Sequence, residues 1–169
     1  TLNTLNINFN ASNGININFL KMKLDQDEYK INIESDKINI FANSYGGKLY
    51  AIISLIHLLF FYEDNLPQGE IQDKPRFKWR GMHLDCARQF HSINQIKRLL
   101  IYMSLFKLNR FHWHLTDNEA WRLDLQSFPN LTKQTSHRGY NQIIPPFYGS
   151  GYEKYGGHYS NAEVKDLID

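Results

Sequence analysis

The feature that most constrains the fold of this sequence is a strand, helix, strand pattern between residues 79 and 115. Trp79 to Leu84 and Phe111 to Leu115 are short apolar segments typical of buried strands, whereas Ile93 to Leu108 carries apolar residues at helical spacing. A helix that connects two strands in this way returns the chain to the same end of the sheet, so the pattern predicts a βαβ unit with parallel strands. Ser92 or Asn94 can cap the helix. The side chains expected to face the core are Ile96, Leu99, Leu100, Met103 and Phe106.

The first part of the chain has a different rhythm. Apolar residues alternate with polar ones in four short segments, which predicts strands with one buried face. These segments are Leu5 to Phe9, Ile15 to Phe19, Tyr29 to Glu34 and Lys37 to Phe41. Ser35 and Asp36 fit the turn of a hairpin. From about Ser44 to Phe61 the apolar spacing becomes helical, so strands followed by a packed helix predict a small α+β domain. The stripe expected to be buried on this helix comprises Leu49, Ile52, Ile53, Ile56, Leu59 and Phe60.

Two segments without clear periodicity divide the chain. The stretch from Asp64 to Pro75 contains two prolines, a glycine and several charges, which indicates a linker and two domains, residues 1–74 and 75–169. Leu125 to Tyr159 is rich in Gly, Pro and Tyr and is expected to form a long irregular loop. Ser160 and Glu163 then have the spacing of a capping box. The helix that this capping box predicts would have only its first turns before the sequence stops at Asp169, so we expect this chain to be a fragment of a longer protein.

Composition excludes several classes of protein. Hydrophobic residues make up 42% and charged residues 21% of the 169 residues, which is the balance of a folded protein. A net charge of +2 is too small for electrostatic binding to nucleic acid. The single cysteine excludes an internal disulfide and a thiolate zinc cluster. The longest apolar stretch, Leu49 to Tyr62, is too short to span a bilayer, so we expect a buried helix and no membrane span.

Polar side chains follow both strands of the predicted βαβ unit. Asp85 and Arg88 come after the first strand, and Asp117 comes after the second. Because the carboxyl ends of parallel strands meet at one edge of a sheet, we expect Arg88 and Asp117 to face one crevice, where a guanidinium can bind sugar hydroxyls or a carboxylate. Two simpler roles remain open: Arg88 can pair with Asp85, and Asp117 can serve as a turn or cap residue. Cys86 is expected to be a small buried residue, and Trp113 and Trp121 are expected to belong to the core.

A pair of histidines gives an alternative hypothesis. His112 and His114 are two residues apart on a predicted strand, so their side chains point to the same face. Two imidazoles on a barrel strand can bind a divalent metal ion, with Asp117 or His137 as a further ligand. This arrangement would indicate a barrel metalloenzyme.

The segment from Trp79 to Phe90, with the sequence WRGMHLDCARQF, resembles the start of the catalytic barrel of glycoside hydrolase family 20, the β-N-acetylhexosaminidases. The resemblance continues through Lys107 to Asp117 and Trp121-Arg122, and more loosely through Pro129 to Thr132 and Gly156 to Ser160. It implies that residues 1–74 form the small α+β domain that precedes this barrel. Residues 75–169 then form the first part of a (β/α)8 TIM barrel, which is incomplete in this chain because such a barrel takes about 250 residues.

The resemblance also implies a reaction. Enzymes of this family remove terminal β-linked N-acetylglucosamine or N-acetylgalactosamine with retention, and the acetamido oxygen of the substrate is the nucleophile. Arg88 matches the arginine that holds hydroxyls of the terminal sugar, and Asp117 matches the aspartate that supports a downstream histidine linked to the catalytic Glu. The family often has a second acid after this aspartate, where this chain has Asn118 and then Glu119. No residue of this chain matches the catalytic Asp-Glu pair.

These matches set the remaining expectations. The partner is a carbohydrate with a terminal N-acetylhexosamine, no cofactor is implied, and the remainder of the barrel is needed for activity. We expect the isolated chain to be inactive and prone to aggregate, because its strand edges are unpaired. The expected location is the periplasm, the cell surface or the extracellular space, or the lysosome in a eukaryote. The alternative hypothesis is a non-catalytic carbohydrate-binding or degenerate remnant of the same fold.

Overall fold

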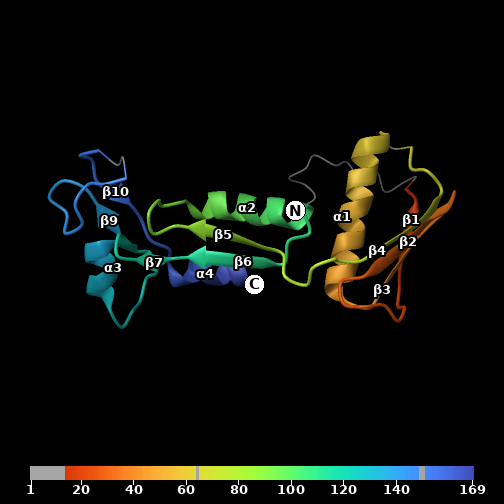
Figure 1. Ribbon diagram of the computed structural model, residues 1–169, viewed down its shortest axis with the longest axis horizontal. Helices are drawn as coiled ribbons and strands as arrows, with labels where there is room; N and C mark the ends of the chain where they lie inside the picture. Colours follow the sequence, from red (N-terminus) through yellow and green to blue (C-terminus); the bar gives the residue numbers. More distant parts are fainter. Residues whose placement is uncertain (1–13, 64, 149–150) are drawn as a thin grey trace. The chain divides into compact units, whose positions relative to one another are not determined.

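The computed structural model describes residues 14–63, 65–148 and 151–169 (Figure 1). Packing divides the chain into two compact units, the first ending at Arg80 and the second beginning at Gly81. The domain boundary expected between residues 74 and 75 stays a prediction. The strand expected from Leu5 to Phe9 lies outside the described residues.

The first unit contains a four-stranded sheet with the order β1-β3-β2-β4 (Figure 1). Its strands are β1 (Asn16–Leu20), β2 (Tyr29–Ile33), β3 (Lys37–Ala42) and β4 (Gly69–Asp73). β2 and β3 form the predicted antiparallel hairpin, whose turn is closed by a hydrogen bond of 2.9 Å from the Glu34 amide to the Lys37 carbonyl. β1 pairs with β3 in parallel at one edge of the sheet. All five residues of β1 are exposed, so the buried face predicted for this strand is wrong.

The core of the first unit lies between this sheet and helix α1 (Tyr45–Tyr62). Alternate residues of β2 and β3 are buried, and Ile31 and Ile40, which are partners in the ladder, are both 0% exposed. The predicted helix begins after Ser44, whose hydroxyl accepts a hydrogen bond of 2.9 Å from the Gly47 amide. The buried positions of α1 end at Ile56, which leaves Phe60 exposed instead of buried as expected.

Helix α1 is long and apolar enough, by length and composition, to cross a membrane, and it is the one such helix in the described residues. It has 18 residues because it starts four positions before the apolar stretch seen in the sequence. The core helix of a soluble protein meets the same criterion. Ala51 and Ile53 of this helix are buried in the core of the first unit.

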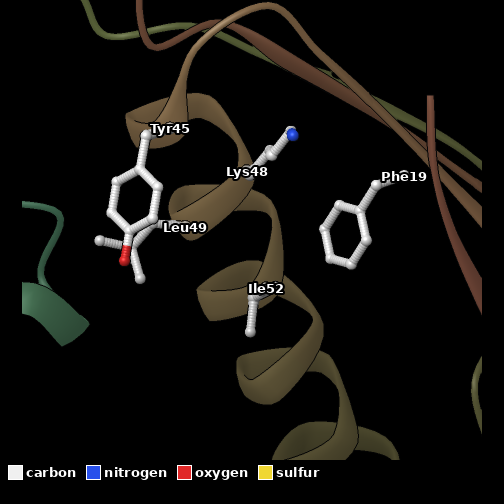
Figure 2. A pocket seen from close by; sticks show the side chains of 5 residues that line it. All are labelled: Phe19, Tyr45, Lys48, Leu49 and Ile52. Atoms are coloured by element: carbon white, nitrogen blue, oxygen red, sulfur yellow. The ribbon is translucent and has the colours of Figure 1, made fainter. Parts of the chain in front are cut away.

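A hollow beside α1 opens between this helix and β1. It is lined by Phe19, Tyr45, Lys48, Leu49 and Ile52 (Figure 2). The Lys48 ammonium lies 5.9 Å from the centre of the Phe19 ring. None of the residues predicted to carry chemistry lines this hollow.

The segment expected to be a linker contains strand β4, so that expectation is wrong. β4 pairs antiparallel with β2 and places Ile71 opposite Ile31. Its only large apolar residue is Ile71, and the other side chains face solvent at the sheet edge, so the period-two signal is weak. An ion pair of 2.7 Å between Lys30 and Glu70 and a hydrogen bond of 2.8 Å from the Tyr29 hydroxyl to Asp73 fix this edge strand to β2.

The second unit is built on the predicted βαβ arrangement. Strands β5 (Gly81–Asp85) and β6 (Arg110–His114) are parallel and are joined by helix α2 (Ile93–Leu105). Ser92 caps α2 in a capping box with Gln95. The helix ends three residues before the predicted end, where Lys107 has a left-handed φ of 56°.

One face of the β5–β6 pair is covered by α2 and by helix α4 (Asn161–Ile168). The predicted capping box of Ser160 and Glu163 begins α4. Cys86, Ile96 and Tyr159 are fully buried at this core. Met103 of α2 is buried as well, but Phe106 is 76% exposed and does not face the core as expected. Alternate strand residues point to the opposite face, where the side chains of His83 and His112 are exposed.

The segment expected to be irregular contains short elements. These are helix α3 (Pro129–Thr135), strand β9 (His137–Arg138) and strand β10 (Tyr155–Gly156), and a small hairpin of β7 (Thr116–Asp117) and β8 (Ala120–Trp121) precedes them. β9 pairs with β10. In the part of the chain that the structure describes, β5 pairs with β6 alone, so the two strands are part of an α/β fold and not a closed barrel.

We expect Ile31→Ala to destabilise the first unit by about 2–5 kcal/mol, because the fully buried side chain would leave a cavity between the sheet and α1. Ile17→Ala on the edge strand β1 is the matched control, since Ile17 is 46% exposed and should change stability by less than about 0.5 kcal/mol. Urea denaturation followed by far-UV circular dichroism measures both changes. Equal effects of the two substitutions would contradict the assignment of the core.

Candidate functional site

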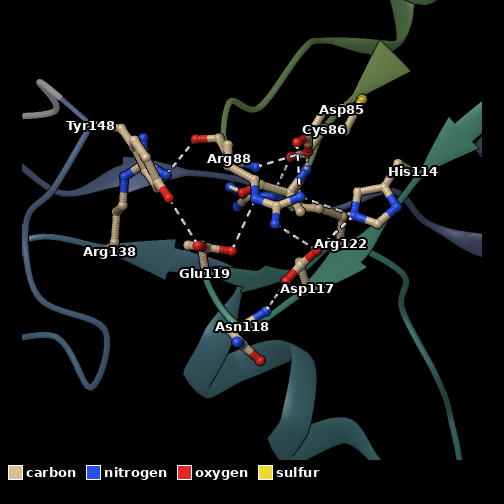
Figure 3. Close-up of polar contacts among 11 residues, drawn as sticks. Asp85, Cys86, Arg88, His114, Asp117, Asn118, Glu119, Arg122, Arg138 and Tyr148 are labelled. Carbon is tan, nitrogen blue, oxygen red and sulfur yellow. Dashed lines mark hydrogen bonds and ion pairs between the residues drawn. The ribbon is translucent and has the colours of Figure 1, made fainter. Parts of the chain in front are cut away.

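Arg88 lies at the centre of a polar cluster at the carboxyl ends of β5 and β6 (Figure 3). Its guanidinium is within 2.9 Å of Asp85, 2.8 Å of Asp117 and 3.1 Å of Glu119. The Nε2 atom of His114 lies 3.2 Å from Nη1 of Arg88. One cation is therefore surrounded by three carboxylates and an imidazole, and its side chain remains 37% exposed.

Asp85 ends β5 and organises the turn that carries Arg88. Its Oδ1 accepts hydrogen bonds from the amides of Ala87, at 2.9 Å, and Arg88, at 3.1 Å, while its Oδ2 pairs with the Arg88 guanidinium. Burial acts to raise the pKa of Asp85, but the hydrogen bonds and charge of Arg88, together with the Ala87 amide, outweigh it and hold this pKa below its usual value. Asp85 is thus the residue that fixes the direction of the Arg88 side chain.

Asp117 follows β6 in the same way. Its Oδ1 accepts a hydrogen bond of 2.8 Å from the Asn118 amide, and its Oδ2 lies 2.9 Å from Nε2 of His114. The Asn118 amide and the His114 ring, with the charge of Arg88, lower the pKa of Asp117. The carboxylate is ionised at neutral pH and joins the ends of the two strands through Arg88.

Glu119 adds a third carboxylate from the hairpin of β7 and β8. Its Oε2 pairs with Nε of Arg88, and its Oε1 accepts a hydrogen bond of 3.0 Å from the Tyr148 hydroxyl. Hydrogen bonding to this carboxylate raises the pKa of Tyr148, so the phenol keeps its proton and acts as a donor. Glu119 therefore links the Arg88 cluster to the loop that precedes β10.

A second arginine holds the backbone beneath this cluster. Arg122 is 0% exposed, and its guanidinium donates to the carbonyls of Cys86 at 2.8 Å, Ala87 at 2.9 Å and Gly157 at 3.1 Å. It also donates to the carbonyl of Ser136. One side chain thus joins the turn after β5, the end of α3 and the segment before α4, which lie far apart in the sequence.

The approach of the backbone to Arg122 depends on glycine. Gly156 has a φ of 142°, and a Cβ atom there would lie 2.2 Å from the Ser136 carbonyl and 2.9 Å from Nη1 of Arg122. Any other residue at this position would displace the guanidinium or the loop. Arg138, which is 2% exposed, adds a hydrogen bond to the Arg88 carbonyl, so two buried arginines hold the backbone of the turn.

The structure brings the predicted site residues together. Arg88 pairs with Asp85, as the simpler interpretation expects, and it also pairs directly with Asp117, so the side chains expected to lie together are in contact. The crevice that Arg88 and Asp117 are expected to face stays a prediction. The roles of Arg88 and Asp117 toward a substrate stay predictions. Cys86 is fully buried, as expected. No sequence pattern indicates a role at the site for Glu119 or Arg138, and Arg122 is indicated only as part of the segment that resembles the family.

The candidate metal ligands are arranged differently from the expectation. His112 and His114 do share a face of β6, but the third histidine near them is His83 of β5. Asp117 contacts His114 by a hydrogen bond, and His137 lies beside the Ser136 hydroxyl, at 2.9 Å, on β9. The signal that could have identified His83 is its position opposite His112 in two parallel strands.

We expect Arg122→Met to destabilise the second unit by more than about 3 kcal/mol, because four carbonyls, three of them in buried hydrogen bonds, would lose a charged donor. Arg98→Met on the exposed side of α2 is the control and should change stability by less than about 0.5 kcal/mol. Urea denaturation followed by tryptophan fluorescence measures both changes, since Trp113 and Trp121 lie in this unit and Trp79 lies in the first. A neutral effect of Arg122→Met would show that these hydrogen bonds are dispensable.

Asp85 should make the stability of this unit depend on pH. A carboxyl whose pKa is lowered by folding stabilises the folded state above its unfolded pKa of about 3.9, and this contribution disappears as the pH falls through the lower folded value. Asp85→Asn should therefore reduce the free energy of unfolding at neutral pH and have a smaller effect below about pH 3. Denaturation midpoints at several pH values measure this, with the exposed Glu153→Gln as control. A pH-independent difference between Asp85→Asn and the unchanged chain would contradict it.

Comparison with known proteins places this geometry in a family. Residues 77–169 match the catalytic domain of glycosyl hydrolase family 20. The chain is 41% identical over 147 residues to a β-hexosaminidase of Vibrio furnissii, which covers 86% of this chain and 24% of that protein. It is 36% identical over 148 residues to the N,N'-diacetylchitobiase of Vibrio harveyi, which covers 83% of this chain and 17% of the relative.

A solved structure agrees with the sequence comparison. The fold is similar to the crystal structure of the family 20 exo-β-N-acetylglucosaminidase of Vibrio harveyi in complex with N-acetylglucosamine, with a TM-score of 0.82 and 40% identity. The match covers 90% of this chain and 25% of that protein, so the chain spans about a quarter of the length of such relatives. Those relatives are TIM-barrel enzymes, of which this chain holds part of the α/β fold. The chain belongs to glycosyl hydrolase family 20, and residues 77–169 are part of its catalytic domain.

Proposed function

We propose that this chain is part of a glycoside hydrolase that removes terminal β-linked N-acetylhexosamine, and that Arg88 and Asp117 belong to its sugar-binding site. The observation that carries the proposal is the ion pair of 2.8 Å between these two side chains at adjacent strand ends. In barrel enzymes the residues at the carboxyl ends of the strands form the active site. Both side chains are partly exposed, at 37% for Arg88 and 25% for Asp117, so a ligand can reach them.

The cluster has the donors and acceptors that a sugar ring requires. A guanidinium has five N–H donors, and the contacts of Arg88 with its three carboxylates occupy three of them. A remaining N–H can donate to a sugar hydroxyl, while a carboxylate such as Asp117 can accept a hydrogen bond from that hydroxyl. Because the carboxylates hold the guanidinium in place before the ligand arrives, little side-chain entropy is lost on binding.

The bond-breaking step needs groups that this chain does not match. In substrate-assisted hydrolysis the acetamido oxygen attacks the anomeric carbon, the glycosidic bond breaks, and an acid gives its proton to the departing oxygen. We assign the acid and the aspartate that orients the acetamido group to a later part of the barrel. Asp117 then acts as a positioning residue, because its carboxylate can support a histidine linked to that acid.

The similarity to a structure that holds N-acetylglucosamine supports the substrate class. The similarity to relatives named β-hexosaminidase and N,N'-diacetylchitobiase supports hydrolysis of a terminal amino sugar. The proposed partner is therefore a glycan that ends in β-linked N-acetylglucosamine or N-acetylgalactosamine.

The test is hydrolysis of a chromogenic N-acetylglucosaminide by the product of the full reading frame that contains this chain. We expect turnover, and we expect Arg88→Ala to lower kcat/KM by about 10- to 100-fold, since the loss is that of hydrogen bonds from a charged group. Arg98→Ala on the exposed side of α2 is the control and should leave kcat/KM unchanged. The isolated 169-residue chain should show no turnover above a buffer blank.

Three outcomes would contradict the proposal. A stop codon directly after Asp169 would favour a non-catalytic remnant, and turnover by the isolated chain would show that the later part of the barrel is not required. Unchanged kinetic constants in Arg88→Ala would remove Arg88 from the sugar site. Circular dichroism of the variant separates a loss of binding from a loss of folding.

A further inference from the structure

Three imidazoles gather on the face of the β5–β6 pair opposite the one that α2 and α4 cover. His83 and His112 are partners in the parallel ladder, and His114 lies two residues further along β6. One ring nitrogen from each histidine lies within 4.8 Å of the others. The ring centres are 4.5 Å apart for His83 and His112, 5.7 Å for His83 and His114, and 6.0 Å for His112 and His114.

Lone pairs of these rings are available for a ligand. Among the described residues, the ring nitrogens of His83 and His112 form no hydrogen bond, and both side chains are exposed. His114 uses Nε2 toward Asp117, at 2.9 Å. A neutral imidazole that donates from Nε2 keeps a lone pair on Nδ1. Histidines that bind metal ions usually donate their other N–H to a carboxylate or carbonyl in this way, because the contact orients the ring.

The charge beside the three histidines is negative. The cluster around Arg88 combines one guanidinium with the carboxylates of Asp85, Asp117 and Glu119, which gives a formal charge of −2. His114 contacts this cluster directly. A divalent cation bound by neutral imidazoles would balance that charge. The attraction of the three carboxylates for the cation would outweigh its repulsion by the nearby Arg88 guanidinium.

We propose that His83, His112 and His114 form a binding site for a divalent first-row transition metal ion, with Zn²⁺ as the best match. Three imidazoles suit Zn²⁺, whereas Mg²⁺ and Ca²⁺ require oxygen ligands. Nitrogens bound at about 2.0–2.1 Å to a tetrahedral ion lie about 3.4 Å apart, so side-chain rotations of the two exposed histidines complete the site. The ion would join β5 to β6 and fix the ring of His114.

This site is independent of the proposed hydrolysis, which uses no metal ion. All three ligands belong to the strands of the second unit, and no step of the sugar chemistry passes through them. Binding of zinc can therefore succeed or fail whether or not the full protein cleaves an N-acetylhexosaminide.

The test is a zinc titration of the monomeric fraction of the 169-residue chain, in competition with a chromophoric chelator. We expect one ion per chain and a rise in the thermal unfolding midpoint on zinc addition. His83→Asn and His112→Asn should each weaken binding by at least about 10-fold, because each removes one of three ligands. His57→Asn, at an exposed position of α1, is the matched control and should bind zinc like the unchanged chain.

The result that would overturn the proposal is either no stoichiometric zinc binding or an affinity that neither strand variant changes. Circular dichroism and zinc-free unfolding curves check that the variants fold, which we expect because both side chains are exposed. Histidine ring NMR signals of the unchanged chain give a readout that needs no substitution. Zinc should shift the signals of His83, His112 and His114, and shifts confined to other histidines would refute the site.

Discussion

The parallel register of β5 and β6 is the constraint on which the polar site depends. Asp85 and His114 are partners at the last position of the ladder. Arg88 lies three residues after the first, and Asp117 lies three residues after the second. Both strands run in the same direction, so the two short extensions leave the sheet at one edge and meet. An antiparallel pairing would separate them by the length of a five-residue strand, about 16 Å.

Arg88 and Arg122 differ in the groups that surround and stabilise their positive charges. Arg88 is partly exposed, and three carboxylates surround its charge, so water and ligand can still reach it. Arg122 is fully buried and is held by backbone carbonyls, whose dipoles replace the water that burial removes. Burial and the nearby Arg138 lower the pKa of Arg122, but a guanidinium keeps its proton in proteins. The charge of Arg122 thus fixes the backbone that carries Arg88, and the charge of Arg88 stays available at the surface.

The sequence predicts those parts of the fold that local periodicity and capping specify. The alternation in β2 and β3, the helical spacing of α1 and α2, and the capping box of Ser160 all correspond to observed elements. β4 was not predicted, because an edge strand with one half-buried residue shows almost no alternation of apolar and polar residues. Helical spacing predicts a buried Phe106, but it cannot show that the helix ends at Leu105 and that the chain turns away at Phe106 and Lys107.

The candidate site was predictable only in part, for a related reason. Arg88 and Asp117 could be placed together because each follows a strand whose direction the βαβ pattern determines. The backbone carbonyls that Arg122 binds lie 14 to 36 residues away in the sequence, and no local sequence pattern predicts such contacts. Glu119 reaches Arg88 through the small hairpin of β7 and β8, whose two-residue strands are too short to give a pattern.

The two faces of the β5–β6 pair show how chemistry is distributed over this chain. The helix-covered face is apolar and aromatic, and the Trp113 and Tyr159 rings lie tilted against each other with their centres 4.6 Å apart. The other face carries His83, His112 and His114, and in a closed barrel it would point to the interior. If these three imidazoles were buried, apolar packing could not replace the hydrogen bonds of their ring nitrogens, because buried polar atoms require hydrogen-bond partners or an ion. The β5–β6 pair therefore has an apolar core on one face and three histidines on the other. His114 contacts Asp117, so these histidines lie directly beside the residues proposed to bind the sugar.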